Sequence, residues 1–164
     1  MSKKKSIYIE TTIPSYITAK DSRDLIRLAR QLSARNFWES ERKKYELFIS
    51  DFVIAECEKG DKKAAQKRLS LLKGLTSLPT TPEVMRLAPV YKDLLQIPER
   101  AKIDAFHFAI AVVHNTDYLL TWNFAHMGVE AYSILLKYNE AHGIKTPLLI
   151  TPDFFIQLDE EENG

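Results

Sequence analysis

Four polar side chains have the types and positions expected of a site for phosphate chemistry. Glu10 and Asn123 each follow a short β-rich run, Glu56 lies about two turns into a segment after a third run, and Asp104 opens a long apolar stretch. Carboxylate and amide oxygens are the ligands that Mg²⁺ and Mn²⁺ prefer in proteins. The four residues are therefore candidate metal ligands.

Each of these residues also has an ordinary structural explanation. Glu10 and Asp104 could be first-turn acids of helices, Glu56 a surface residue and Asn123 a turn residue. Asp104 fits that explanation least well, because it shares the stretch 103–113 with only one other polar side chain, His107. A buried charge needs a partner.

A shared site would explain the three acids together. Carboxylates that converge at one place repel one another and raise each other's pKa values. A divalent cation removes this repulsion. Magnesium takes only a few carboxylates and often binds substrate phosphate oxygens as well, which indicates phosphate chemistry.

The elements needed to position these residues alternate along the chain. Strands are expected at 6–9, 47–49, 75–78, 118–121 and 148–150. Helices are expected at 22–44, 51–56, 61–72, 83–95, 102–114 and 130–141. Strands separated by helices predict an α/β fold with a central, mainly parallel sheet and helices on both faces. Ligands bind such sheets beyond the carboxyl ends of the strands, which is where Glu10 and Asn123 lie. Asp117 begins its strand, so it is expected at the opposite edge, roughly 20 Å from Asn123.

Composition fits one globular domain and excludes some functions. The 164 residues are 45% hydrophobic and 27% charged, and the five glycines are too scattered for a dinucleotide-binding or phosphate-binding glycine loop. The single cysteine, Cys57, excludes an intramolecular disulfide and a zinc site with paired cysteines. No apolar run approaches the length of about 20 residues needed to span a bilayer. A cytoplasmic protein without a membrane segment is expected.

Charge is unevenly distributed along the chain. Residues 1–75 hold 17 Lys and Arg against 10 Asp and Glu, whereas residues 76–164 hold 6 against 12. The helices expected at 22–44 and 61–73 carry much of the basic charge. A basic half can attract a polyanion such as RNA, although charged helix faces are also common simply because they face water.

Four short motifs resemble those of the PIN-domain nucleases. The stretch 8–13 (YIETTI) is similar to the family's first motif, and 49–56 (ISDFVIAE) resembles the second, which ends in Glu. The stretch 104–111 (DAFHFAIA) is similar to the third motif, and 118–124 (YLLTWNF) to the fourth. The stretch 147–152 is similar to the closing strand. The resemblance follows the family's order over nearly the whole chain.

This resemblance implies a single PIN-like domain over residues 1–157, followed by an acidic tail at 158–164. It implies an endoribonuclease that hydrolyses RNA phosphodiester bonds with Mg²⁺ or Mn²⁺, held by Glu10, Glu56, Asp104 and Asn123 as catalytic metal ligands. A VapC-like toxin would have an antitoxin partner, and PIN-like proteins are commonly homodimers. The cation would lower the pKa of a water and polarise the phosphate. Thr12 or Thr121 could orient such a water, or serve only in packing or capping.

Two departures from the family pattern favour an alternative. The first acid is usually Asp and is Glu10 here, and the fourth is usually Asp and is Asn123, so three acids carry a charge of −3 instead of −4. The alternative is a catalytically impaired PIN-like module that binds RNA or protein. A metal phosphatase is a weaker alternative, because the chain has no DxD motif.

Three aromatic residues complete the expectations. His107 could be a general base, but its place within an apolar helix face favours a structural role. Phe37 and Trp38 lie among charged residues in the middle of the helix expected at 22–44. Either they pack on the sheet, or at least one is exposed at a dimer interface.

Overall fold

The fold is built on a five-stranded sheet in which every pairing is parallel. The computed structural model describes residues 2–164. The strand order is β3-β2-β1-β4-β5, so β1 lies in the centre. Its neighbours β2 and β4 pair with Tyr8 through Phe48 and Leu119, respectively. The strands are β1 (Ser6–Ile9), β2 (Glu46–Ser50), β3 (Thr76–Leu78), β4 (Tyr118–Leu120) and β5 (Leu148–Ile150).

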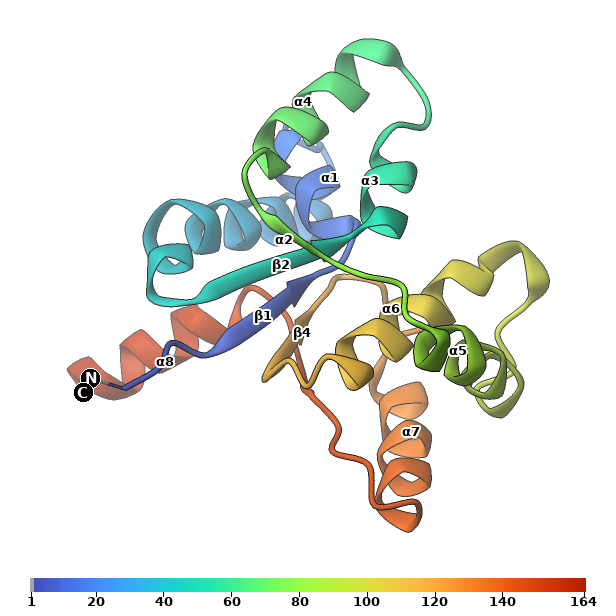
Figure 1. Ribbon diagram of the computed structural model, residues 1–164. Helices are drawn as coiled ribbons and strands as arrows, with labels where there is room; N and C mark the ends of the chain where they lie inside the picture. The colour runs from blue at the N-terminus through green and yellow to red at the C-terminus, as the bar shows by residue number, and fades with distance from the viewer. Residues whose placement is uncertain (1) are drawn as a thin grey trace.

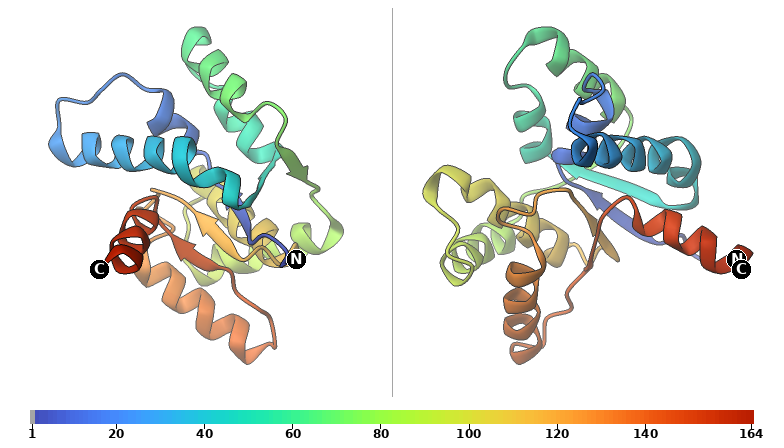
Figure 2. Two further views of the ribbon diagram at one scale, coloured as in Figure 1. Left: turned by 90° about the vertical axis from the view of Figure 1, so that its left-hand side faces the viewer. Right: turned by 180° about the vertical axis from the view of Figure 1, so that it is seen from behind.

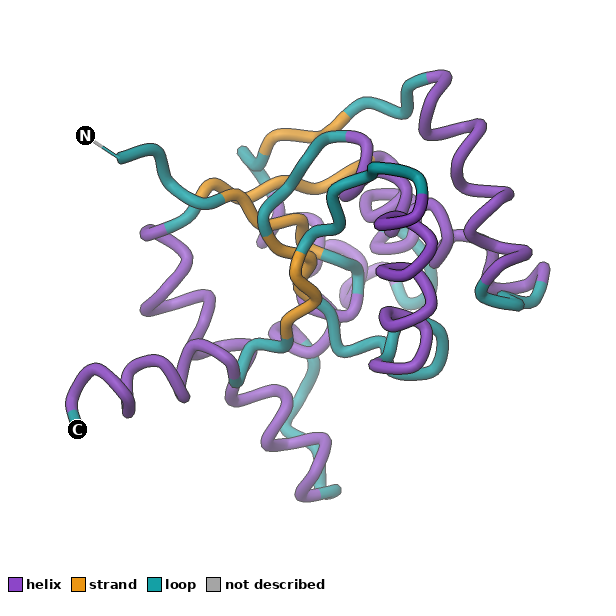
Figure 3. The backbone as a smooth tube through the Cα atoms, turned by 90° about the horizontal axis from the view of Figure 1, so that it is seen from below, coloured by secondary structure: helices purple, strands orange, loops and turns teal. Residues whose placement is uncertain are grey.

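Helices cover both faces of this sheet, as expected. Figure 1 shows α1, α2 and α4 gathered on one side and α5, α6 and α7 on the other, and Figure 3 shows the strands enclosed between helices. The helices are α1 (Thr12–Thr18), α2 (Leu25–Asn36), α3 (Asp51–Cys57), α4 (Lys62–Leu72), α5 (Pro82–Leu94), α6 (Lys102–Val113), α7 (Val129–Ala141) and α8 (Phe154–Asn163). The predicted α/β architecture is therefore confirmed.

The core explains why β1 and α6 are apolar. Ile7, Tyr8 and Ile9 are completely buried, because β1 has a neighbouring strand on each side and helices on both faces. The stretch 107–112 of α6 is also buried throughout. A helix that is apolar nearly all round belongs in the interior. Between residues 2 and 164, no helix is both long enough and apolar enough to cross a membrane.

The single helix expected at 22–44 is wrong in its detail. Helix α2 begins only after Asp24, whose side chain accepts a hydrogen bond from Arg27 N (2.8 Å). It ends at Asn36 and continues as a π-helical turn, Phe37–Glu41 (η1), and a 3₁₀ turn, Arg42–Lys44 (η2). The wider π turn accompanies the burial of two adjacent aromatics, Phe37 and Trp38. Of the two alternatives that the sequence left open for these residues, the structure therefore has both packed within the protein and neither exposed for a dimer interface.

Two helices were not expected. Helix α1 follows Glu10 closely, and its Pro14 stands in the first turn, where proline is tolerated. Helix α8, red in Figure 2, runs across the expected start of an acidic tail at residue 158. Its Phe155 is 1% exposed and packs on Phe37, with ring centroids 4.8 Å apart. The residues from 160 onward are exposed.

Candidate active site at the carboxyl edge of the sheet

The carboxyl ends of β1, β2 and β4 bring the predicted residues to one edge of the sheet. Glu10 follows β1, and Thr121 follows β4 directly. Glu56 lies in α3, which begins where β2 ends because Ser50 caps it and accepts a hydrogen bond from Val53 N. Asp104 stands in the first turn of α6, as expected.

Glu10 is a buried carboxyl held by two threonines. It is 2% exposed, and Oε2 accepts hydrogen bonds from Thr12 N (3.0 Å), Thr12 Oγ1 and Thr121 Oγ1 (2.7 Å). Burial raises the pKa of this carboxyl, although the charge of His107 and the threonine hydrogen bonds oppose the rise. None of the ion pairs within residues 2–164 includes Glu10. Since buried charges are generally paired or bind metals, this carboxyl fits a cation ligand.

Glu56 is held by a histidine at the centre of a buried network. His107 is fully buried, with Nε2 2.6 Å from Glu56 Oε1 and Nδ1 2.7 Å from the Tyr8 hydroxyl. That hydroxyl is in turn 2.7 Å from Ser50 Oγ. Thr11 Oγ1 donates a second hydrogen bond to Glu56 Oε1 (2.7 Å). Both ring nitrogens of His107 are therefore engaged, which agrees with the structural role favoured by the sequence.

The charges of this network stabilise one another. Burial acts to lower the pKa of His107, but its hydrogen bond to Glu56 and the charges of Glu10, Glu56 and Asp104 outweigh burial and raise it. Burial acts to raise the pKa of Glu56, but its hydrogen bond with His107 and the charge of that ring outweigh burial and lower it. The two groups therefore favour each other's charged form, the carboxylate of Glu56 and the imidazolium of His107.

Asp104 has the partner that its burial requires, and sequence reasoning missed it. Asp104 is 8% exposed, and its Oδ2 accepts a hydrogen bond from His126 Nδ1 (2.7 Å). His126 comes from the turn between β4 and α7. The sequence did contain a signal for this partner, because His126 follows Asn123 by three residues in a loop that leaves the carboxyl edge.

Asn123 shapes that turn. Its N–H donates to Thr121 Oγ1 (2.9 Å), and its Oδ1 accepts a hydrogen bond from His126 N (3.4 Å). These contacts fit the role of a turn residue, which the sequence left open for Asn123. No side-chain hydrogen bond or ion pair of the described residues joins Asn123 to an acid.

The donor set suits a hard divalent cation. No group of three or more His, Cys, Asp or Glu side chains in the described part of the chain is close enough to hold a metal ion as it stands. Magnesium, however, commonly binds through one or two carboxylates and keeps several waters. Glu10 and Asp104 can supply these oxygens, and the hydrogen bonds of Glu10 recorded within residues 2–164 all go to Oε2, which leaves Oε1 available.

Aromatic and basic side chains stand beside the acids. Trp122 N donates to Thr12 Oγ1 (2.8 Å), which ties this residue to the Glu10 loop. The guanidinium carbon of Arg30 on α2 lies 5.6 Å from the ring centroid of Trp122 and 5.1 Å from that of Phe124. Phe124 is 47% exposed. An arginine over aromatic rings is a combination that binds phosphate and stacks on bases.

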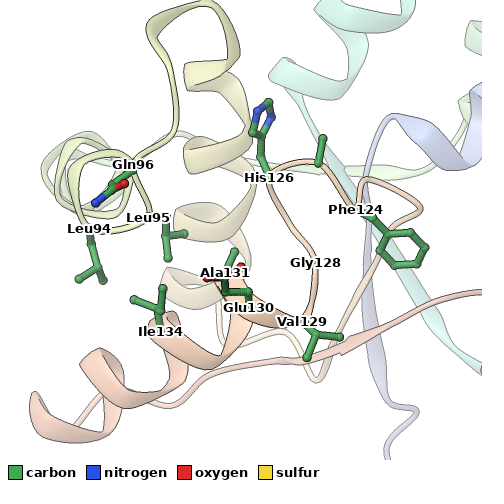
Figure 4. Close-up of a pocket in the computed structure, with 11 residues that line it drawn as sticks. Leu94, Leu95, Gln96, Phe124, His126, Gly128, Val129, Glu130, Ala131 and Ile134 are labelled. Atoms are coloured by element: carbon green, nitrogen blue, oxygen red, sulfur yellow. The ribbon is translucent and has the colours of Figure 1, made fainter.

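A pocket of about 700 Å³ lies next to this edge, between the end of α5, the turn 124–128 and the start of α7. Figure 4 shows Leu95, Ala131 and Ile134 on one side of it and the turn on the other. The His126 side chain extends from the turn away from Val129 and Ile134. His126 thus belongs both to the pocket lining and to the acid edge.

The opposite edge of the sheet holds Asp117. Its Oδ2 accepts hydrogen bonds from Ser6 N (2.8 Å) and Ser6 Oγ (3.1 Å) at the start of β1. The hydrogen bond from Ser6 N lowers the pKa of Asp117 most, burial acts to raise it, and the bond from Ser6 Oγ lowers it further, so that the pKa is lowered overall. Asp117 is thus kept from the acid edge, as its position at the start of β4 predicts.

Comparisons with known proteins agree with this arrangement. The sequence model of the PIN domain matches residues 7–124, which is most of the chain and includes all four candidate residues. No curated protein matches. A chain in the crystal structure of VapBC2 from Rickettsia felis, bound to a DNA fragment from the promoter, has a similar fold, with a TM-score of 0.55 and 18% identity. That alignment covers 89% of this chain and 98% of the other. The chain therefore belongs to the PIN domain family.

Proposed function

We propose that this protein is a Mg²⁺- or Mn²⁺-dependent endoribonuclease that hydrolyses RNA phosphodiester bonds. The observation that carries the proposal is the buried Glu10 carboxyl, which has no cationic side chain paired to it within residues 2–164 and lies at the same sheet edge as Asp104 and Glu56. PIN domains are generally nucleases, which supports hydrolysis of a nucleic acid.

Each of these residues has a separate role in such a reaction. Glu10 and Asp104 would hold the cation, which when bound neutralises phosphate charge and activates water. Thr12 and Thr121 fix the rotamer of Glu10 through its Oε2. His107 favours the ionised form of Glu56, and Oε2 of Glu56 can therefore accept a hydrogen bond from a water beside the phosphate. Arg30 would bind the RNA backbone, and the exposed Phe124 would stack on a base.

We further propose that the protein is the toxin of a toxin–antitoxin pair. The similar chain of known structure comes from a VapBC2 complex, which supports an antitoxin as partner. A gene for a small DNA-binding protein beside the gene for this chain would favour this role. A cytoplasmic location stays a prediction.

The decisive experiment is cleavage of RNA with and without Mg²⁺ or Mn²⁺. Wild type should cleave only with the cation, and Asp104→Ala should lower the rate about a hundredfold or more, because it removes a charged group from the reaction centre. Asp93→Ala is the matched control, since Asp93 is an exposed acid on α5 whose side chain makes no hydrogen bond to any residue from 2 to 164. Equal cleavage by wild type and Asp104→Ala would contradict the proposal.

The second candidate function is a PIN-like module that binds RNA or protein without cutting. The observation that favours it is that Asn123, at the place of the family's fourth acid, caps a turn and brings no charge. Wild type that binds RNA but does not cleave it with either cation would establish this alternative.

A further inference from the structure

A histidine, and not the amide that aligns with the family's fourth acid, contacts Asp104 at the sheet edge. Asn123 Oδ1 points back to the His126 backbone N–H, whereas the His126 ring reaches Asp104. The turn that Asn123 stabilises therefore positions the His126 ring beside Asp104.

We propose that His126, together with Asp104, binds the cation directly and that its imidazole makes the site prefer Mn²⁺ to Mg²⁺. This inference rests on the proposed function only in that the site holds a divalent cation. It names a residue and a metal preference that the four-residue set of Glu10, Glu56, Asp104 and Asn123 lacks.

The distance between the two side chains supports a shared cation. His126 Nδ1 and Asp104 Oδ2 are 2.7 Å apart, and adjacent ligands of one octahedral cation lie about 3 Å apart for bonds of about 2.1 Å. His126 is accessible as well, because its side chain is 26% exposed whereas that of Asp104 is 12% exposed. A cation can therefore take the place of the proton between the two atoms with little movement of either side chain, and the neutral imidazole that binds it through Nδ1 carries its proton on Nε2.

The chemistry of the imidazole determines the metal preference. Mg²⁺ takes oxygen ligands almost exclusively, whereas first-row transition ions bind nitrogen more readily along the series that begins with Mn²⁺. A neutral nitrogen in place of a carboxylate also removes one negative charge, which weakens the attraction for both cations, but the bond to nitrogen offsets this loss more for Mn²⁺ than for Mg²⁺. His107 cannot take this role, because Tyr8 and Glu56 occupy both its nitrogens.

Metal binding tests the proposal separately from cleavage. Calorimetric titration with Mn²⁺ and with Mg²⁺, together with pulsed electron paramagnetic resonance of bound Mn²⁺, should be carried out on wild type, His126→Gln and Asn123→Asp. His142→Gln is the matched control, because this exposed histidine at the end of α7 bonds only within its own turn. Melting temperatures near that of wild type would show that the variants are folded.

The expected result is a ¹⁴N coupling on Mn²⁺ in wild type and His142→Gln that disappears in His126→Gln. Mn²⁺ affinity should fall about tenfold in His126→Gln, while Mg²⁺ affinity changes less. Asn123→Asp should bind Mn²⁺ as wild type does.

Three results would overturn the proposal. These are the absence of ¹⁴N coupling in wild type, a coupling that persists in His126→Gln, and an Asn123→Asp variant that binds either cation about tenfold more tightly. If nitrogen-bound Mn²⁺ is found and no RNA is cleaved, only the proposed function fails. If cleavage depends on metal but the coupling is absent, only the role of His126 fails.

Discussion

At the scale of single residues, the acid edge contains one carboxyl whose ionisation opposes folding. Glu10 is buried, and burial raises its pKa. Such a group binds more protons in the folded state than in the unfolded state, so its contribution to stability falls as the pH rises above its ordinary pKa of 4.5 toward the raised pKa of the folded state. Near neutral pH and without a divalent cation, this carboxyl therefore destabilises the fold.

Replacing Glu10 with Gln should raise the melting temperature of the metal-free protein at pH 7. The amide keeps an oxygen acceptor for Thr12 and Thr121 and removes the buried charge. Each kcal/mol gained corresponds to about 2–4 °C for a chain of this size. The gain should shrink as the pH falls toward 4.5. Calorimetric melting from pH 4.5 to 8 measures this.

The same variant provides an internal control. Mn²⁺ should raise the melting temperature of wild type but have little effect on Glu10→Gln, because the cation stabilises only the form that binds it. A Glu10→Gln variant that melts below wild type at pH 7 without metal would show instead that the carboxylate is satisfied by its hydrogen bonds.

The limits of sequence reasoning about residues are clearest at Asp104. The apolar stretch around it predicts that it is buried and needs a partner, which is confirmed. The partner could not be identified from helical spacing, because His126 comes from a turn 22 positions later in the chain. Only the parallel pairing of β4 with β1 brings that turn to α6. Positions 10, 56 and 104 could be placed at one edge because each follows a recognisable strand or opens a recognisable helix.

At the scale of elements, the strands and the long helices could be predicted because the spacing of their apolar residues matches the faces that they bury in the core. The expected bounds of α4, α5, α6 and α7 are within one residue of the observed ones. Helix α1 was missed because Pro14 and β-branched residues resemble a loop, although proline is suited to a first turn. The π turn η1 could not be predicted from periodicity; it accompanies the burial of Phe37 and Trp38, and Phe37 packs on Phe155, which is distant in sequence.

Helix α8 shows the same limit and leads to a prediction about the domain boundary. Its acidic end looks like a solvated tail, and Phe155, which lies before the expected boundary at 157, is buried against Phe37 and Tyr45, with ring centroids 4.8 Å and 5.3 Å away. Phe155→Ala should reduce the free energy of unfolding by about 3–5 kcal/mol, as expected for a buried aromatic. Ile156→Ala is the neighbouring control, because Ile156 is 37% exposed. Urea denaturation measures both.

A pair of truncations locates the boundary itself. Removing residues 158–164 deletes mainly exposed side chains and should leave stability close to that of the full chain. Removing residues 154–164 also deletes Phe155 and should destabilise the protein at least as much as Phe155→Ala. If both truncations lowered stability equally, the acidic end would be part of the domain and the boundary at 157 would be wrong.

At the scale of the whole molecule, the predicted homodimer needs a surface other than Phe37 and Trp38. Helix α2 offers one, because Leu25 is 80% exposed, Ile26 68% and Leu32 54%. These side chains turn outward, whereas Gln31 and Ala34 of the same helix are buried against the protein. Exposed apolar residues gathered on one element are typical of an interaction surface.

We expect this side of α2 to meet its counterpart on a second copy of the chain, because most small oligomers are twofold dimers that use one surface twice. Sedimentation velocity at tens of micromolar should then give a dimer for wild type and a monomer for Ile26→Asp, since a buried charge opposite its own copy is strongly unfavourable. Met85→Asp, at an exposed apolar position on α5 (54%), should remain dimeric. Wild type that sediments as a monomer would contradict the dimer altogether, whereas a dimer that survives Ile26→Asp would place the interface elsewhere.

Because α2 also carries Arg30 to the acid edge, dimerisation through α2 would hold two RNA-binding edges in a fixed relation. Ile26→Asp should then weaken RNA binding without changing the affinity for Mn²⁺.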